Sequence, residues 1–144
     1  MGIALSRLIT LLLALSLGAA HAQSDAPSLR KDSTIEVLYL GANDCPYCNH
    51  WESKAKGELL ASPEGKSIRF VEVKGDTLRQ PILEKHFPAD YKWVFKQIGP
   101  SRGVPRFLLV IDGKIMLNAY GTGGYTDVFL PALWEIVARR AAMS

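Results

Sequence analysis

The chain of 144 residues carries 17 lysines and arginines against 14 aspartates and glutamates, a formal net charge of +3 at pH 7. The charges are scattered, without a run of one sign, so the composition argues against nucleic acid or an anionic membrane as the partner. The length suits one domain with its own hydrophobic core. Nothing in the sequence resembles an appended dimerisation domain, and we expect a monomer.

Residues 1–22 predict a secretory signal peptide. A single charge, Arg7, precedes an apolar run at 8–17, and Ala20-His21-Ala22 has the small-x-small pattern that signal peptidase recognises. The run is shorter than the about 20 apolar residues of a transmembrane helix. We therefore expect cleavage after Ala22, export to a bacterial periplasm and no stable membrane insertion afterwards. An uncleaved N-terminal anchor is the alternative.

The next residues divide into a flexible lead-in and a domain. Residues 23–34, QSDAPSLRKDST, are polar and contain proline and serine, so we expect the folded domain to occupy 35–144. Within it, IEVLYLGA at 35–42 is apolar on both faces, which predicts a buried central strand. This strand runs directly into NDCPYCNHWE at 43–52, which holds the only two cysteines of the chain.

A helix is predicted from Pro46, because inward-facing side chains recur at helical spacing at Cys48, Trp51, Ala55 and Leu59. Proline suits a first helical position, and Asn43 or Asp44 is a candidate cap. Glu52 and Lys56 are spaced for an ion pair along the helix. The cysteine motif therefore lies where a strand ends and a helix begins.

The remaining chain predicts an α/β domain. SIRFVEVK at 67–74 predicts a second strand, and 77–98 is mainly helical in pattern, with breaks at its prolines. Two apolar runs within 106–121 surround Asp112-Gly113, a strong hairpin signal. GTGG at 121–124 predicts a turn, and an amphipathic helix follows, capped by Thr126 or Asp127. This order of elements predicts a three-layer sandwich.

The spacing of Cys45 and Cys48 favours chemistry over a structural role. A disulfide that encloses only Pro46 and Tyr47 closes too short a loop to restrict the unfolded chain much. Cys45 begins the predicted helix, where unpaired N–H groups and the helix dipole stabilise a thiolate. Cys48 lies one turn further in and is less ionised. A carboxylate beside Cys45, that of Asp44, opposes this effect unless it points away.

The strand-CPYC-helix unit, the segment GVPRFLLVIDGK near residue 105 and the final helix resemble the thioredoxin superfamily, over residues 35–142. The resemblance implies a thioredoxin-like three-layer α/β/α sandwich with a mixed central sheet. It implies a redox-active Cys45–Cys48 disulfide, with Cys45 as nucleophile and Cys48 as resolving cysteine, and it implies no cofactor. It further implies that Pro105 is cis, against the disulfide, and that the backbone at Val104 binds substrate peptides.

Two positions depart from the pattern of thioredoxins. Tyr39 stands where they carry a buried aspartate that assists the resolving cysteine, and Asp44 stands where a tryptophan usually precedes the first cysteine. Glu72, in an otherwise apolar strand, is a possible replacement proton acceptor; a solvent-exposed residue or a partner for a lysine is the alternative. Arg102 and Arg106 flank the proline, and we expect both to be solvated.

The leading hypothesis is a periplasmic thiol-disulfide oxidoreductase that acts on protein thiols and disulfides together with an unidentified redox partner, with reduction as the preferred direction. One alternative is a zinc or copper site built from Cys45 and Cys48 with His50 or His86. Another is a non-catalytic binding module that the disulfide switches.

Overall fold

The computed structural model describes residues 28–143. The predicted signal peptide and the lead-in as far as residue 27 lie outside the described residues. None of the helices within 28–143 combines the length and the apolar character that a membrane span requires.

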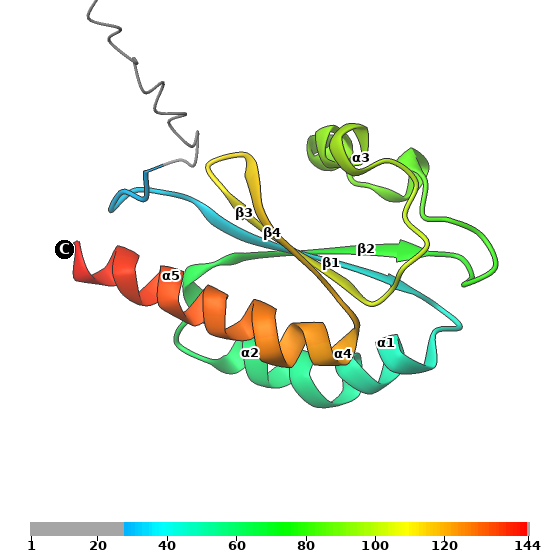
Figure 1. The fold of residues 1–144 in the computed structure, drawn as a ribbon, viewed down its shortest axis with the longest axis horizontal. Coiled ribbons are helices and arrows are strands. Elements are labelled where there is room, and N and C mark those ends of the chain that lie inside the picture. The colour runs from blue at the N-terminus through cyan, green and yellow to red at the C-terminus, as the bar shows by residue number, and fades with distance from the viewer. Residues whose placement is uncertain (1–27, 144) are drawn as a thin grey trace, which may run out of the picture.

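A four-stranded mixed sheet forms the middle layer (Figure 1). Its order is β2-β1-β3-β4, with β1 parallel to β2 and antiparallel to β3, and β3 antiparallel to β4. The strands are β1 (Ile35–Ala42), β2 (Arg69–Gly75), β3 (Arg106–Ile111) and β4 (Lys114–Tyr120). The two central strands are almost entirely buried because helices cover both of their faces.

One face of the sheet is covered by two long helices, each interrupted by a π-helical stretch (Figure 1). The first consists of α1 (Pro46–Trp51), a π-helical stretch (Glu52–Lys56) and α2 (Gly57–Ala61). The second consists of α4 (Gly121–Gly124), a π-helical stretch (Tyr125–Phe129) and α5 (Leu130–Ala142). The opposite face carries α3 (Lys92–Ile98), so the predicted three-layer α/β/α sandwich is confirmed.

Each face of the sheet has its own apolar core. On the face of the long helices, Tyr39 and Phe107 pack with the two cysteines and Trp51. On the face of α3, the neighbouring strand positions, such as Leu40 and Leu108, pack with Val94 and the side chains around it. This division follows from the alternation of side chains along a strand.

The hairpin was predicted correctly, and two helical predictions were wrong. Asp112 and Gly113 take positive φ values of 47° and 75°, as a tight two-residue turn requires. Within 77–98 only α3 is α-helical, preceded by single 3-10 turns at Glu84–His86 and Ala89–Tyr91. The earlier part is extended instead, because the backbone of Ile82 pairs with that of Ser101.

The last helix begins at Gly121, earlier than the predicted start at Thr126 or Asp127. GTGG is therefore the first turn of the helix and not a separate turn. Gly121 has φ 73°, and its N–H donates to the carbonyl of Pro105 at 2.8 Å, which fixes where the helix starts. Burial of Tyr125 and Phe129 holds this poor helix-forming stretch in helical geometry.

Candidate active site

Cys45 and Cys48 form a disulfide at the end of β1, with a Cα–Cα distance of 5.1 Å. Cys45 is the N-cap of α1, and its Sγ accepts a hydrogen bond from the backbone N–H of Cys48 at 3.0 Å. Pro46 takes the first helical position, as predicted. The cap is Cys45 itself, so the prediction of Asn43 or Asp44 as cap was wrong. A donor aimed at Sγ stabilises a thiolate there after reduction.

The two cysteines are almost equally covered in the disulfide form. Cys45 is 1% exposed and Cys48 is fully buried. The exposed fraction therefore does not distinguish the two cysteines, but their positions differ: Cys45 is the N-cap of α1 and its sulfur accepts the N–H bond, whereas Cys48 lies inside the helix.

Asp44 is turned away from the helix and toward the loop after β2. Its two carboxylate oxygens accept from the Thr77 hydroxyl at 2.6 Å and from the Leu78 N–H at 2.7 Å. These hydrogen bonds lower the pKa of Asp44, so it is ionised at neutral pH. Asp44 therefore anchors the 77–78 loop beside Cys45.

The Val104–Pro105 bond is cis, as the resemblance implies. Because Leu40 pairs with Arg106 across β1 and β3, the next residue back, Pro105, lies at the same end of the sheet as the cysteines. Pro105 is buried and Val104 is half-buried. The sheet thus brings together the CxxC motif and the proline loop.

Arg106 is buried, so the expectation that it is solvated was wrong; Arg102 is exposed as expected. The Arg106 Nε donates to Asn118 Oδ1 at 2.9 Å, its Nη1 donates to Ser101 Oγ at 3.1 Å, and its guanidinium lies 4.8 Å from the Tyr120 ring centroid. Burial lowers the pKa of Arg106. Its place in the sheet explains the burial, because β1 and β4 flank it on both sides.

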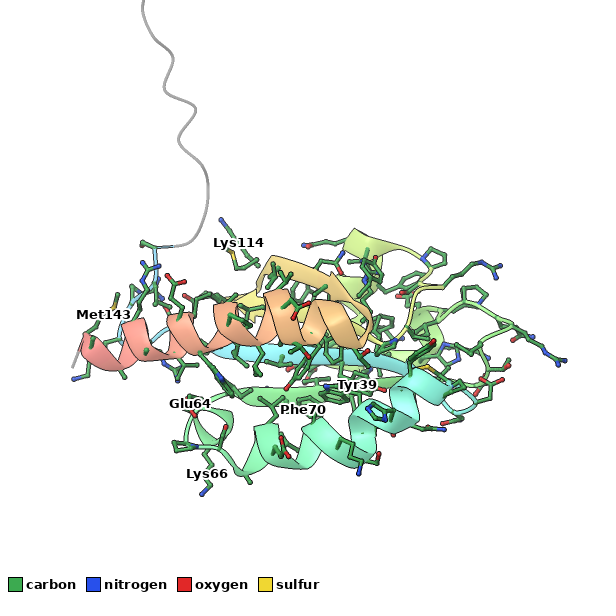
Figure 2. All side chains as sticks on the ribbon, turned by 60° about the horizontal axis from the view of Figure 1, so that its bottom comes forward. Tyr39, Glu64, Lys66, Phe70, Lys114 and Met143 are labelled. Atoms are coloured by element: carbon green, nitrogen blue, oxygen red, sulfur yellow. A yellow bond between two sulfur atoms is a disulfide. The ribbon has the colours of Figure 1, made fainter. Side chains whose placement is uncertain are left out.

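A polar network lies between β2 and the first long helix. The Tyr39 hydroxyl donates to Glu52 Oε1 at 2.6 Å, and Lys74 bonds the same carboxylate. Burial and the bond to Glu52 raise the pKa of Tyr39 far above its ordinary value. Burial acts to raise the pKa of Glu52, but the bonds from Lys74 and Tyr39 hold it below its usual range. Figure 2 shows Tyr39 between the sheet and this helix.

Glu72 forms an ion pair with Lys56. The predicted pair of Glu52 with Lys56 is therefore not formed, because each of them bonds a residue of β2 instead. Sequence reasoning missed Glu52 as the partner of Tyr39. Spacing gives no signal for this contact, because Tyr39 lies on β1 and Glu52 lies on the first long helix, 13 residues further along the chain.

The imidazoles considered as metal ligands are not gathered with the cysteines. His86 bonds Asp76 through Nε2 and accepts from the Leu83 N–H through Nδ1, whereas His50 is exposed on α1. Within residues 28–143 no group of three or more His, Cys, Asp or Glu side chains is arranged to hold a metal ion.

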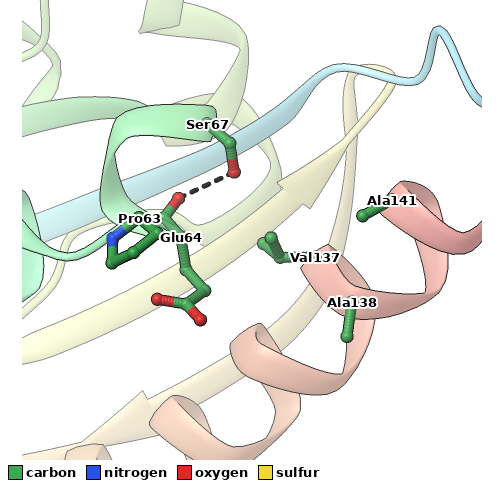
Figure 3. A pocket seen from close by; sticks show the side chains of 6 residues that line it. All are labelled: Pro63, Glu64, Ser67, Val137, Ala138 and Ala141. Carbon is green, nitrogen blue, oxygen red and sulfur yellow. Dashed lines mark hydrogen bonds between the residues drawn. The ribbon is translucent and has the colours of Figure 1, made fainter.

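A cavity of about 270 Å³ lies where α5 ends (Figure 3). It is formed by the last turns of α5 and the segment before β2, lined by Pro63, Glu64, Ser67, Val137, Ala138 and Ala141. The disulfide, by contrast, lies at the start of α1, and α1 lies beside α4, where the other long helix begins. This cavity is therefore separate from the cysteine site.

The sheet, its two helical layers, the disulfide at a strand–helix junction and the cis-proline define a thioredoxin-like fold. Among solved structures, a thioredoxin of Malassezia sympodialis is similar, with a TM-score of 0.51 and 15% identity over 72% of this chain and 78% of that one. At this identity the likeness establishes the fold alone.

Two further solved structures are similar to this chain. The periplasmic thioredoxin SoxS of Paracoccus pantotrophus has a TM-score of 0.49 and 19% identity, over 74% of this chain and 98% of its own. Thioredoxin f of spinach chloroplast has a TM-score of 0.48 and 17% identity, over 74% and 79%. No protein-family model matches the chain, and no curated protein matches its sequence.

Proposed function

We propose that the chain is a thiol-disulfide oxidoreductase that exchanges disulfides with protein substrates. The observation that carries the proposal is the Cys45–Cys48 disulfide at the start of α1, where the Cys48 N–H donates to the Cys45 sulfur. A sulfur in this position is a better leaving group and forms a thiolate more readily than an ordinary cysteine.

In the reducing direction, the Cys45 thiolate attacks a substrate disulfide. A Cys45–substrate disulfide forms, and the other substrate sulfur leaves as a thiolate that takes up a proton. Cys48 then loses its proton and attacks Cys45 Sγ, which releases the second substrate thiol and forms the Cys45–Cys48 disulfide. Two electrons pass from the dithiol to the substrate, and the reverse sequence oxidises a substrate dithiol.

Two other groups enter this proposal. The backbone at Val104, before the cis-proline, pairs with an extended substrate segment. Glu72 accepts the proton of Cys48. Because Glu72 forms an ion pair with Lys56, this pair must separate before the carboxylate can take up the proton. If Glu72 has this role, Glu72→Gln slows resolution of a preformed mixed disulfide without slowing its formation, and Lys56→Met does not reproduce the defect.

We further propose export to the periplasm, cleavage after Ala22, a monomeric mature protein and a reducing role. A compartment that is kept oxidising needs dedicated reductants for particular clients, which supports that direction. Redox titration against dithiothreitol or glutathione tests it: a potential near thioredoxin's about −270 mV supports a reductase, and one near about −120 mV an oxidant. N-terminal sequencing and light scattering of the exported protein test the other points.

The experiment that tests the function is a mixed-disulfide trap. In Cys48→Ala the resolving step is absent, so we expect the full chain expressed in bacteria to accumulate adducts with client proteins through Cys45, separable on non-reducing gels. Cys45→Ala is the matched control and should accumulate none. Absence of adducts in Cys48→Ala, or equal adducts in the control, would contradict the proposal.

A further inference from the structure

Asp44 places a carboxylate directly before the cysteine that the proposed function makes the nucleophile. A negative charge near a thiol raises the pKa of that thiol and makes the thiolate scarcer. The energy between two charges falls as the distance between them grows. The direction of the Asp44 side chain therefore affects how readily Cys45 reacts.

The loop at 76–80, after β2, binds the Asp44 side chain. Thr77 Oγ1 donates to Asp44 Oδ2 at 2.6 Å and the Leu78 N–H donates to Oδ1 at 2.7 Å, so both carboxylate oxygens have a donor. The Thr77 hydroxyl also accepts from the Arg79 N–H at 3.3 Å, which fixes this hydroxyl between the loop backbone and Asp44. The loop therefore holds the carboxylate on the side away from the helix.

Strand pairing brings Asp44 and this loop together, although Thr77 follows 33 residues later in the chain. β1 and β2 are parallel, with Ala42 opposite Gly75. The Asn43 N–H donates to the Gly75 carbonyl at 3.2 Å, which extends the pairing past the end of β1. The loop thus leaves the sheet beside the cysteine motif, and the sheet fixes its position relative to Asp44.

Other carboxylates near this end of the sheet have partners of their own. Asp76, in the same loop, bonds Lys85 and His86, and Glu52 of the first long helix bonds a tyrosine and a lysine of the sheet. Other ionisable side chains of the segments around Cys45 are phenolic or basic: Tyr47, His50, Arg79, Arg102, Arg106 and Tyr120. The hydrogen bonds, and to a smaller extent the charge of Arg79, lower the pKa of Asp44, so this carboxylate stays charged near neutral pH.

We propose that Thr77 is a positioning residue for the nucleophile: its hydroxyl holds the charged Asp44 side chain away from the Cys45 sulfur and so keeps this sulfur reactive. This inference rests on the proposed function and deepens it. In the absence of the Thr77 hydroxyl, Asp44 keeps one of its two bonds and is free to turn toward the helix start. There it lies closer to the sulfur and opposes the thiolate that the Cys48 N–H stabilises.

The test follows alkylation of Cys45 by iodoacetamide against pH in the reduced protein, with the modified cysteine identified by mass spectrometry. In Thr77→Val we expect the pH midpoint of alkylation to rise by at least about 0.5, which is an about three-fold lower rate below the midpoint. Thr77→Ser keeps the hydroxyl and should keep the midpoint. In Asp44→Asn the charge is gone, so adding Thr77→Val should change nothing further.

Thr126→Val is the matched control. Its hydroxyl also donates to a neighbouring group, the Thr122 carbonyl at 3.0 Å, but it lies on the second long helix, and the midpoint should stay at the wild-type value. An unchanged midpoint in Thr77→Val would overturn the proposal. So would a rise that persists in the Asp44→Asn background, because a purely structural effect of the loop does not need the charge.

The wild-type protein separates this inference from the proposed function. If its Cys45 has the midpoint of an ordinary thiol, about 8.5, and reduces no disulfide, not even oxidised glutathione, the proposed function itself fails. If the wild-type cysteine is more acidic and reacts, but Thr77→Val changes neither property, the oxidoreductase stands and Thr77 does not position Asp44 for it.

Discussion

Arg106 is the residue whose environment differs most from its sequence pattern. A basic residue beside a loop proline indicates a solvated side chain, but here Arg106 is 6% exposed and its guanidinium bonds neutral partners. Its bonds join the loop before the cis-proline, through Ser101, to β4, through Asn118. Burying a cation is costly unless its donors are satisfied. Arg106 is therefore a positioning residue for the proline loop.

Replacing Arg106 by Met should destabilise the protein by about 1–3 kcal/mol, because Ser101 and Asn118 lose a buried partner. The looser loop should raise the KM for a peptide disulfide more than it lowers kcat. Arg106→Lys keeps the charge and should recover part of both losses. Urea unfolding and steady-state kinetics measure these effects.

Arg102→Met is the control for Arg106, because Arg102 is an exposed arginine of the same loop, two residues before Val104 of the cis peptide bond. Its unfolding free energy should stay within about 0.5 kcal/mol of the wild type. Should Arg106→Met lose stability with no change in KM, Arg106 would be a purely structural residue.

At the scale of elements, the sequence predicted the four strands and the helix after the cysteines, because their apolar periodicity is continuous. It failed where a tertiary contact overrides local propensity. The stretch 121–124 contains three glycines and indicates a turn, yet the Gly121 N–H bonds Pro105 and the buried Tyr125 completes the helix. The segment at Ile82 is likewise extended because its backbone pairs with that of Ser101, and the sequence near Ile82 contains no pattern that predicts this pairing.

Two glycines in α4 should respond oppositely to alanine. Gly121 has φ 73°, a conformation that L side chains rarely adopt, so Gly121→Ala should destabilise the protein by at least about 1 kcal/mol. Gly123 is in the same helical turn, without positive φ and with open space around an added Cβ. Gly123→Ala should therefore stabilise it by about 0.4–1 kcal/mol. Denaturant midpoints measure both, and equal signs would contradict this account of the helix start.

At the scale of the whole molecule, the sequence located the reactive pair and the proline loop but not the surface around them. CxxC at a strand–helix junction and Val-Pro before a hairpin are local signals. The proximity of Thr77 to Asp44 depends on the strand order, which places β2 beside β1. The bonds of Glu52 with Tyr39 and Lys74 join residues far apart in the chain, so spacing alone could not predict them.

The charged groups of the fold predict how its stability depends on pH. Hydrogen bonds hold the pKa of Asp44, Asp76 and Asp112 below the ordinary value of an aspartate. Such carboxylates stabilise the fold above the pKa they have in the unfolded chain, and this contribution is lost as the pH falls through their folded pKa. The unfolding free energy should therefore decline below about pH 4.

At alkaline pH the unfolding free energy is limited by buried tyrosines, whose pKa values are raised in the folded protein instead of lowered. Burial raises the pKa of Tyr125 to about 12, and burial and a bond to Glu36 raise that of Tyr91 to about 12. Both stabilise the fold fully below the unfolded value of about 10, and the contribution is lost as the pH rises through about 12. Urea unfolding of the disulfide form from pH 3 to 11 should give an unfolding free energy that is constant between these two limits.

Asp112→Asn should make the decline of the unfolding free energy at acid pH, the acid limb, less steep. The reason is that the Thr34 N–H and the Ser33 hydroxyl then bond a side chain that is neutral at every pH. An unchanged acid limb in this variant would mean that other carboxylates control acid unfolding.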